Sequence, residues 1–245
     1  DVDWFASDIP DFARALMTAF WPGPLTLILP RKSDVAQATA GGQNSIGLRC
    51  PSHPVAQALL QACAVAGIHG LAAPSANQFG RVSPTSAAHV QSEFGHDLLV
   101  LNGGPCSVGI ESSIVDCTRG VPVLLRPGVL TREQLEKAAL RRIFAPGDAT
   151  PLALDAPRVS GSLESHYAPY ATVRMMDAQA LQSAVDVLRP ELSSSPNKAP
   201  SIAVYTRTSL KRLPRGMLRR DMPQDAIGAA RELFATLREL DTTGV

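Results

Sequence analysis

The sequence has no marked excess of charge of either sign. Its 245 residues include 23 lysines and arginines against 22 aspartates and glutamates, a formal net charge of +1. A protein that binds nucleic acid chiefly through the phosphate backbone needs a strongly basic face, so this balance argues against a general nucleic-acid clamp. One local basic cluster, between Lys211 and Arg220, is interpreted as a solvated face near a turn.

Cysteine and histidine are scarce. The chain has four cysteines and five histidines, and no cysteine belongs to a Cys-x-x-Cys motif. The histidines do not pair with cysteines at ligand spacing, so we expect no metal site. Each cysteine lies in or beside an apolar run, which predicts reduced core thiols and suits a cytoplasmic protein. These residues are Cys50, Cys63, Cys106 and Cys117.

Long hydrophobic runs are absent as well. No apolar stretch reaches membrane-spanning length and no signal peptide is present, so we expect no membrane partner and a cytoplasmic location. The chain has no initiator methionine, opens on Asp1 within what resembles the inside of a domain, and stops just after an amphipathic helix. We therefore expect a fragment of a longer protein.

The composition does provide for a core. Hydrophobic residues make up 45% of the chain, enough for one good core or two modest ones. Over residues 1–143 short apolar runs alternate with helical patterns, which is typical of an α/β domain. Strands are predicted at 25–29, 46–50, 71–73, 98–101, 112–116 and 122–126. Helices are predicted at 8–20, 53–66, 84–94 and 131–140, the last with a capping box of Thr131 and Gln134.

The composition changes over residues 144–170, where prolines, glycines and serines crowd together. This predicts an extended connector, followed by a small second α/β domain over residues 171–245. Within the connector, Ser162–Pro169 is an aromatic island that serves either as a docking anchor or as a lid over a site. In the second domain we expect strands at 171–176 and 202–206 and helices at 178–188 and 225–240.

Polar residues follow the predicted strand at 71–73. Ser75 and Asn77 come first, then Ser83 fits a helix N-cap and Pro84 the first helical position. The N–H groups at the start of that helix would suit a phosphate. The alternative is an ordinary strand-to-helix loop in which Ser83 is only a cap.

Two other apolar strands end in arginine, at Arg49 and Arg126. A guanidinium at the end of a buried strand is costly unless it meets an internal carboxylate or an anionic ligand. Together with Asn77, these strand ends suggest a shared anionic pocket. The run Glu111-Ser112-Ser113 interrupts another apolar segment, either as part of a site or as an edge strand with a wet face. No Gly-x-Ser-x-Gly elbow supports a serine nucleophile.

The polar segments occur in a familiar order and cover nearly the whole chain. They closely resemble the two-domain form of the YrdC-like threonylcarbamoyl-AMP synthases. This resemblance implies an α/β fold, with a YrdC-like twisted mixed sheet with flanking helices and a small C-terminal Rossmann-like α/β domain. The segments are FWPGPLTLILP (20–30), GLRCPSHP (47–54), APSANQFGRVSPT (73–85), LNGGPCSVGIESSIVD (101–116), LLRPG (124–128) and HYAP (166–169).

The resemblance implies a cytoplasmic nucleotidyltransferase that condenses L-threonine, bicarbonate and ATP into threonylcarbamoyl-adenylate and pyrophosphate, with Mg²⁺ accompanying ATP. The product would feed threonylcarbamoyladenosine formation in tRNA. The tRNA and the downstream threonylcarbamoyl transferase are therefore candidate partners. No covalent nucleophile is expected. The implied ATP-binding residues are Ser45, Ser75, Asn77, Ser83, Arg126 and Tyr167, and the implied threonine-binding residues are Arg49, Ala73 (through its backbone) and Ser113.

The chain departs from the family pattern at several points. Ser113 stands where the family usually has Thr, and the connector lacks the more frequent Pro-Gly-Met. A first strand carrying a Thr, and a Lys/Arg-rich segment for the triphosphate, are not in the sequence, so we expect weak ATP binding and no turnover. Two alternatives remain open: a carbamoyl-adenylate-handling YrdC-type domain, and a non-catalytic RNA-binding module.

Overall fold

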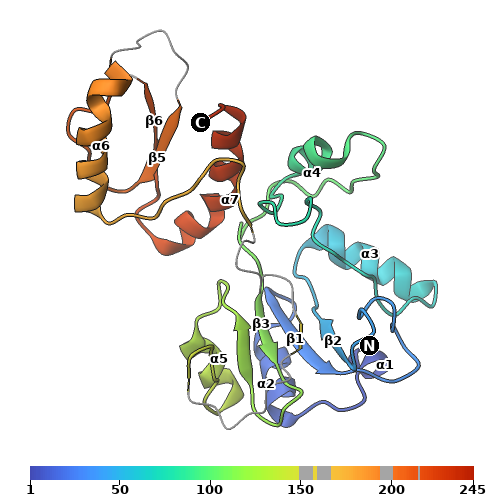
Figure 1. Cartoon of the computed structure of the whole chain (residues 1–245). Helices are drawn as coiled ribbons and strands as arrows, with labels where there is room; N and C mark the ends of the chain where they lie inside the picture. Colours follow the sequence, from blue (N-terminus) through green and yellow to red (C-terminus); the bar gives the residue numbers. More distant parts are fainter. Residues whose placement is uncertain (149–156, 159–166, 194–200, 215) are drawn as a thin grey trace. The chain divides into compact units, whose positions relative to one another are not determined.

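The computed structural model describes residues 1–148, 157–158, 167–193, 201–214 and 216–245 (Figure 1). Contacts divide the chain into two compact units. The first comprises Asp1–Ser75, Leu99–Gly104 and Ile110–Glu164, and the second comprises Ala76–Leu98, Pro105–Gly109 and Ser165–Val245. The domain boundaries at 143 and 170 stay a prediction, and much of the connector lies outside the described residues.

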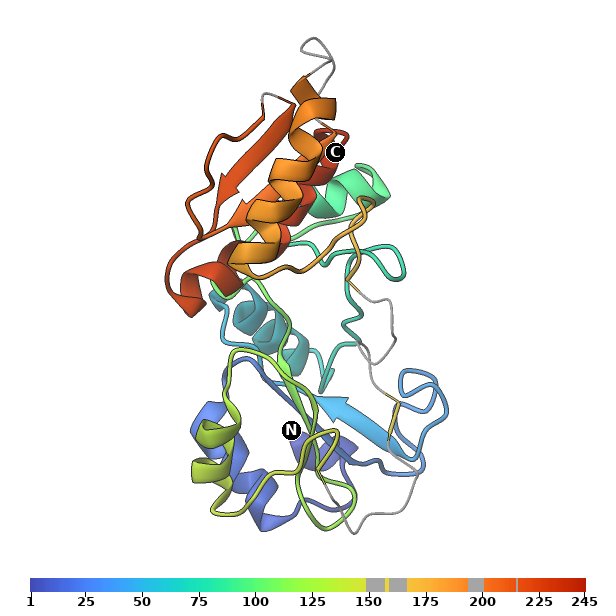
Figure 2. The same cartoon turned by 60° about the vertical axis from the view of Figure 1, so that its left-hand side comes forward.

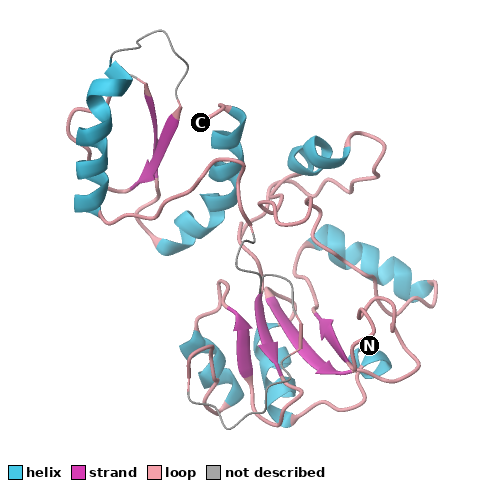
Figure 3. Ribbon diagram, in the orientation of Figure 1, coloured by secondary structure: helices cyan, strands magenta, loops and turns pink. Residues whose placement is uncertain are grey.

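The first unit is built on a four-stranded mixed sheet with strand order β2-β1-β3-β4 (Figure 3). Strand β1 is antiparallel to β2 and parallel to β3, and β3 is antiparallel to β4. This arrangement confirms the expected mixed α/β class. The bounds are β1 (Leu25–Pro30), β2 (Ser45–Leu48), β3 (Ser113–Asp116) and β4 (Val123–Arg126).

One face of this sheet carries the core. Side chains from β1, β3 and β4 pack against helices α2 (Asp11–Phe20) and α5 (Arg132–Ala139), and Leu16, Leu27 and Leu135 are fully buried there. Burial of such side chains is the main stabilising term of the unit. Helices α1 (Val2–Phe5) and α3 (Pro54–Val65) complete it.

Several sequence predictions for the first unit are wrong. Residues 71–73 and 98–101 form no strand, and Leu99 is 88% exposed. An apolar run becomes a strand only where a neighbouring strand completes its hydrogen bonds. Helix α3 forms as expected, but none of its residues is buried. Its periodicity predicts an apolar face without deciding whether anything covers that face.

The second unit contains a parallel pair of strands, β5 (Ile202–Thr206) and β6 (Met217–Asp221). Helix α6 (Ala178–Ser193) lies along this pair in Figures 1 and 2, and Val185 packs with Val204 and Met217. Helices α4 (Ala87–Phe94) and α7 (Ala226–Thr242) complete the unit.

Strand β6 is a finding that the sequence does not predict, since the charged residues at its end favour a solvated face near a turn. Only Met217 of this strand is buried. Conversely, the strand predicted at 171–176 is absent, and Met175 is almost fully exposed. The apolar residues of α7 are only partly buried. Phe234 is buried, whereas Ile227 is exposed.

The helix N-caps predicted from the sequence are partly correct. The Thr131 hydroxyl accepts from the Gln134 N–H, and the Gln134 side chain accepts from the Thr131 N–H, so the capping box is confirmed. Ser83, however, does not cap α4, because the helix begins three residues later than expected and Ser86 is its N-cap. The helix predicted from residue 8 likewise begins three residues later, at Asp11, with Pro10 at the N-cap position.

No helix within the described ranges combines the length and apolar character needed to span a membrane. Among those same residues no group of three or more His, Cys, Asp or Glu side chains could hold a metal ion. The cysteines are thiols, but the expectation that all four lie in the core is wrong. Cys117 is buried, Cys50 and Cys63 are half-buried and Cys106 is exposed.

Replacing Thr131 with alanine should lower the free energy of unfolding by about 1 kcal/mol, because the N-terminal amides of α5 lose their side-chain acceptor. Thr18→Ala is the matched control, since this exposed hydroxyl only donates to the Arg14 carbonyl within α2. Urea denaturation of both variants measures the difference. Equal stability of the two variants would contradict the role of the cap.

The cysteines should differ sharply in reactivity. Burial, and then the neighbouring Asp116 carboxylate, raises the pKa of the Cys117 thiol well above its usual range, and the thiolate is the reactive form. We expect iodoacetamide at neutral pH to label Cys106 in the folded protein and Cys117 only after denaturation. Peptide mass spectrometry identifies the labelled sites, and prompt labelling of native Cys117 would refute the assignment.

Candidate functional site

The sheet of the first unit has a second face, opposite the core, and Arg49 belongs to it. Successive side chains of a strand alternate between the two faces. In β1 the leucines point into the core, so Thr26 and Ile28 point to the other face, where Ile28 pairs with Gly47 of β2. By the same alternation Ser45 lies on this second face, and Arg49, which directly follows β2, is assigned to it by continuing the alternation one residue further. We call it the open face and define it by Thr26, Ile28, Ser45, Gly47 and Arg49.

Arg49 is exposed, and its side chain forms no ion pair or hydrogen bond with any described residue. The sequence allows either an internal carboxylate or an anionic ligand as the partner of Arg49. No internal carboxylate pairs with it in the described part of the chain. A guanidinium in this setting suits a carboxylate or phosphate group of a ligand.

Arg126, in contrast, has an internal carboxylate. Its Nε donates to the Ser112 carbonyl at 3.0 Å, and its Nη2 donates to Ser112 Oγ at 3.1 Å and lies 3.4 Å from Glu111 Oε2. The Ser112 hydroxyl also shares a hydrogen bond with the Thr26 hydroxyl, at 2.8 Å. These contacts hold the guanidinium in a fixed orientation at the end of β4, beside the open face.

The resemblance implies a site role for Ser113 and none for Ser112, but the structure places the two side chains differently. Ser113 pairs with Leu25, is fully buried, and donates to the Leu130 carbonyl at 3.4 Å. Its side chain therefore points to the core side of the sheet. The signal that could have distinguished them is strand alternation, since Ser112 and Ser113 must face opposite ways.

Gly128 of the LLRPG motif has a structural role in this arrangement. A Cβ at this position would lie 2.5 Å from the Ser113 nitrogen and 2.7 Å from its Oγ. The absence of a side chain lets the loop after β4 approach the first residue of β3.

Ser45, Ala73 and Ser75 complete the predictions for the first unit. Ser45 is half-buried and pairs with Pro30, at the end of β1. Arg49 lies near the beginning of β1, where the Gly23 N–H donates to the carbonyl of the neighbouring Cys50. Ser45 and Arg49 thus share a face but lie at opposite ends of β2. Ala73 and Ser75 are both exposed, in the stretch that forms no strand.

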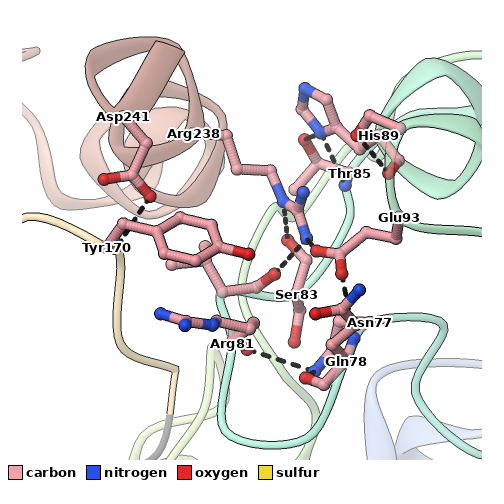
Figure 4. Close-up of polar contacts among 12 residues, drawn as sticks. Asn77, Gln78, Arg81, Ser83, Thr85, His89, Glu93, Tyr170, Arg238 and Asp241 are labelled. Atoms are coloured by element: carbon pink, nitrogen blue, oxygen red, sulfur yellow. Dashed lines mark hydrogen bonds and ion pairs between the residues drawn. The ribbon is translucent and has the colours of Figure 1, made fainter. Parts of the chain in front are cut away.

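In the second unit, residues 77–83 form a loop that is organised by its own asparagine (Figure 4). Asn77 Nδ2 donates to the carbonyls of Gln78, at 2.8 Å, and Arg81, at 3.1 Å. Asn77 Oδ1 is buried and has no hydrogen-bond partner among the described residues. A buried acceptor without a donor is unfavourable, so this atom is a natural contact for a ligand donor.

Ser83 is buried at the end of this loop, and its carbonyl accepts from Nε of Arg238 in α7 at 3.3 Å. Next to it, Nδ1 of His89 accepts from the Thr85 N–H at 3.2 Å. Burial, and then the nearby Arg238 guanidinium, lowers the pKa of His89, in keeping with a neutral ring that can accept this hydrogen bond.

The described end of the aromatic island contacts the same loop and α7, and Tyr170, which follows the island, contacts the loop as well. The Ala168 N–H donates to the Gly80 carbonyl at 2.9 Å, the Tyr167 ring lies 5.6 Å from that of Phe234, and the Arg81 guanidinium stacks 3.6 Å above the Tyr170 ring. The docking-anchor interpretation of the island stays a prediction. The lid interpretation stays a prediction, because residues 159–166 lie outside the described structure.

A cavity of about 460 Å³ also lies in the second unit, but its lining contains none of the predicted site residues. It is lined by Thr85, Pro105, Cys106, Ser107, Arg231, Glu232 and Ala235.

Comparison with family models assigns both parts of the chain. The Sua5/YciO/YrdC model, which bears the description telomere recombination, matches residues 1–128. The model for the C-terminal domain of threonylcarbamoyl-AMP synthase matches residues 130–245.

Curated relatives agree with these models. Threonylcarbamoyl-AMP synthase from Pyrococcus abyssi is 33% identical over 98% of this chain and 68% of its own length. The Schizosaccharomyces pombe protein of that name is 31% identical over 97% of this chain and 61% of its own. The Bacillus subtilis protein is 43% identical over 52% of this chain and 36% of its own. The chain thus spans between about a third and two thirds of these relatives.

A solved structure extends the agreement to the fold. The crystal structure of P. abyssi Sua5 complexed with L-threonine superposes with a TM-score of 0.78 at 31% identity, over 100% of this chain and 69% of that one. With both family models in chain order and a relative matched over nearly the whole sequence, this chain belongs to the threonylcarbamoyl-AMP synthase family of enzymes.

Proposed function

We propose that this chain carries the L-threonine and ATP binding functions of a cytoplasmic threonylcarbamoyl-AMP synthase. The reaction joins L-threonine, bicarbonate and ATP into threonylcarbamoyl-adenylate and releases pyrophosphate and water. Besides family membership, one observation carries the proposal. The open face presents an arginine, Arg49, that is exposed and has no ion pair among the described residues, and the related P. abyssi protein was crystallised with an amino acid, L-threonine.

Arg49 is assigned to the threonine carboxylate, because a guanidinium can donate two parallel hydrogen bonds to a carboxylate. Ser113 keeps a role near threonine only through its backbone, since its hydroxyl donates to Leu130 on the core side. We assign a polar contact with the substrate to Ser112 instead, because its hydroxyl lies between Thr26 and Arg126. Ala73 stays assigned to threonine through its backbone.

The nucleotide is assigned to Ser45, Ser75, Asn77, Ser83, Arg126 and Tyr167, as the resemblance implies. Asn77 has the clearest physical basis, because a ribose hydroxyl or the adenine amino group could donate to its buried Oδ1. Arg126 is held rigidly by Ser112 and Glu111, so it would offer a preorganised cationic edge, although Glu111 offsets part of its charge.

In the proposed reaction the carbamate formed on the threonine nitrogen attacks the α-phosphorus. A new P–O bond forms, the bond between the α-phosphorus and the bridging oxygen breaks, and pyrophosphate leaves with that electron pair. The protein contributes positioning and charge neutralisation, and no covalent nucleophile is needed.

Mg²⁺ is proposed to arrive with ATP. The described residues hold no group of three carboxylate, imidazole or thiol ligands, and magnesium commonly binds through substrate phosphates with few protein ligands. The bound ion would neutralise charge on the leaving pyrophosphate. Neither the RNA-binding module nor the carbamoyl-adenylate-handling domain is favoured by the comparisons.

Arg49→Gln should weaken the affinity of the 245-residue chain for L-threonine about 10- to 100-fold, because loss of a charge-assisted hydrogen bond costs roughly 1.5–3 kcal/mol. Isothermal titration calorimetry with L-threonine measures this change. Arg14→Gln is the matched control, since Arg14 is an exposed arginine of α2 whose ion pair with Asp3, at 3.6 Å, is also exposed.

The control variant should bind L-threonine as the wild type does, and both variants should unfold at the wild-type temperature. Equal L-threonine affinities of the Arg49 and Arg14 variants would contradict the carboxylate assignment. A wild-type chain without measurable affinity for L-threonine would contradict the proposed function.

A further inference from the structure

We propose that Arg238 and Asp241 of α7 are positioning residues for nucleotide binding, and that together they latch the 77–83 loop and the 167–171 segment in place. All of these residues belong to the second unit. Figure 4 shows the two side chains reaching from α7 toward the loop and toward Tyr170. The inference rests on the proposed function, since it assigns the loop to ATP.

Arg238 makes a concentrated set of contacts at the end of the loop. Its guanidinium pairs with Glu93 of α4 at 2.6 Å and donates to the carbonyls of Val82 and Ser83. Its side chain is 13% exposed and that of Glu93 is 10% exposed. Three acceptors from two segments therefore converge on one largely buried cation of α7.

Glu93 also contacts the beginning of the loop. Its second carboxylate oxygen accepts from the Gln78 N–H at 3.1 Å. Gln78 is the neighbour of Asn77, and the Gln78 carbonyl in turn accepts from Asn77 Nδ2 and the Arg81 N–H. The backbone on both sides of the loop is thus tied to the Arg238–Glu93 pair.

Asp241 holds the other segment. It lies three residues beyond Arg238, and residues three apart on a helix share a face. Its two carboxylate oxygens accept from the Tyr170 N–H at 2.9 Å and the Ala171 N–H at 3.0 Å. Tyr170 then stacks on Arg81, so the segment held by Asp241 packs on the loop held by Arg238.

The chemistry of these contacts suits positioning. A buried ion pair adds little net stability against an apolar replacement, but removal of one partner leaves a buried charge without compensation. Loss of Arg238 should remove the partner of Glu93 and of the Val82 and Ser83 carbonyls, and thereby weaken the Glu93 contact with Gln78. The orientation of Asn77 Oδ1 would then no longer be fixed. Threonine contacts assigned to Arg49 and Ser112 belong to the first unit and should not depend on Arg238.

The experiment compares Arg238→Ala, Arg238→Lys and Asp241→Asn with Glu239→Gln in the 245-residue chain. Glu239 is the matched control, because it neighbours Arg238 in α7 but pairs with Arg220 of β6 at 2.7 Å, and both members are about half exposed. Hydrogen exchange of residues 78–83 and 167–171 is measured without ligand, and the affinities for ATP and L-threonine are measured by calorimetry.

For Arg238→Ala we expect the hydrogen-exchange rate of residues 78–83 to rise about tenfold and the ATP affinity to fall about tenfold. These changes correspond to about tenfold shifts in the equilibrium constants for loop opening and for ATP binding. L-Threonine affinity should stay within about twofold. Arg238→Lys should recover part of the ATP affinity, since it keeps the charge but not the planar fork. Asp241→Asn should raise exchange first in residues 167–171, and Glu239→Gln should change none of these quantities.

The latch would be overturned if Arg238→Ala had the same hydrogen exchange in residues 78–83, or the same ATP affinity, as the Glu239→Gln control. It would also be overturned if Arg238→Ala lost ATP affinity and L-threonine affinity equally. If Arg238→Ala does not fold, the same criteria apply to Arg238→Lys. A wild-type chain that binds no ATP would contradict the proposed function, while the exchange data would still decide whether α7 holds the loop.

Discussion

The alternation of side chains along β1 is the constraint on which the first unit depends. Its leucines supply the centre of the core, and Thr26 and Ile28 consequently face the other way. Because paired strands share the pleat, this one choice assigns Arg49 to the open face, Ser113 to the core and Ser112 to the hydrogen-bond group around Arg126. The core and the candidate site therefore lie on opposite faces of the sheet because side chains alternate along its strands.

Three arginines show how the surroundings give one residue type different roles. Arg126 is fixed by Ser112 and Glu111, Arg238 is buried with Glu93, and Arg49 remains exposed without an ion pair among the described residues. A guanidinium with an internal carboxylate has part of its charge compensated and its orientation fixed, whereas one without it can engage an anionic ligand. The proposed division into positioning and binding arginines follows from this difference.

In the second unit, one helix connects two segments that are far apart in the sequence. Arg238 contacts Val82, Ser83 and Glu93, and Asp241 contacts Tyr170 and Ala171. The loop assigned to the nucleotide therefore takes its shape from contacts with α7 as well as from its own turn. This gives the C-terminal part of the chain a physical connection to the proposed chemistry.

Features that depend on near neighbours could be predicted from the sequence alone. The capping box of Thr131 and Gln134, the strands at β1, β3 and β4, and the ordered motifs that identify the family are all read from local patterns. Other features follow from contacts between segments that are distant in the chain, which the folded structure alone reveals. It left 71–73 without a strand, made β6 a strand, gave the α4 cap to Ser86 and turned Ser112 rather than Ser113 toward Arg126. These outcomes depend on partners distant in the chain, such as Arg238 for Ser83 and Glu93. A local sequence pattern does not show which distant groups will satisfy its hydrogen bonds and charges.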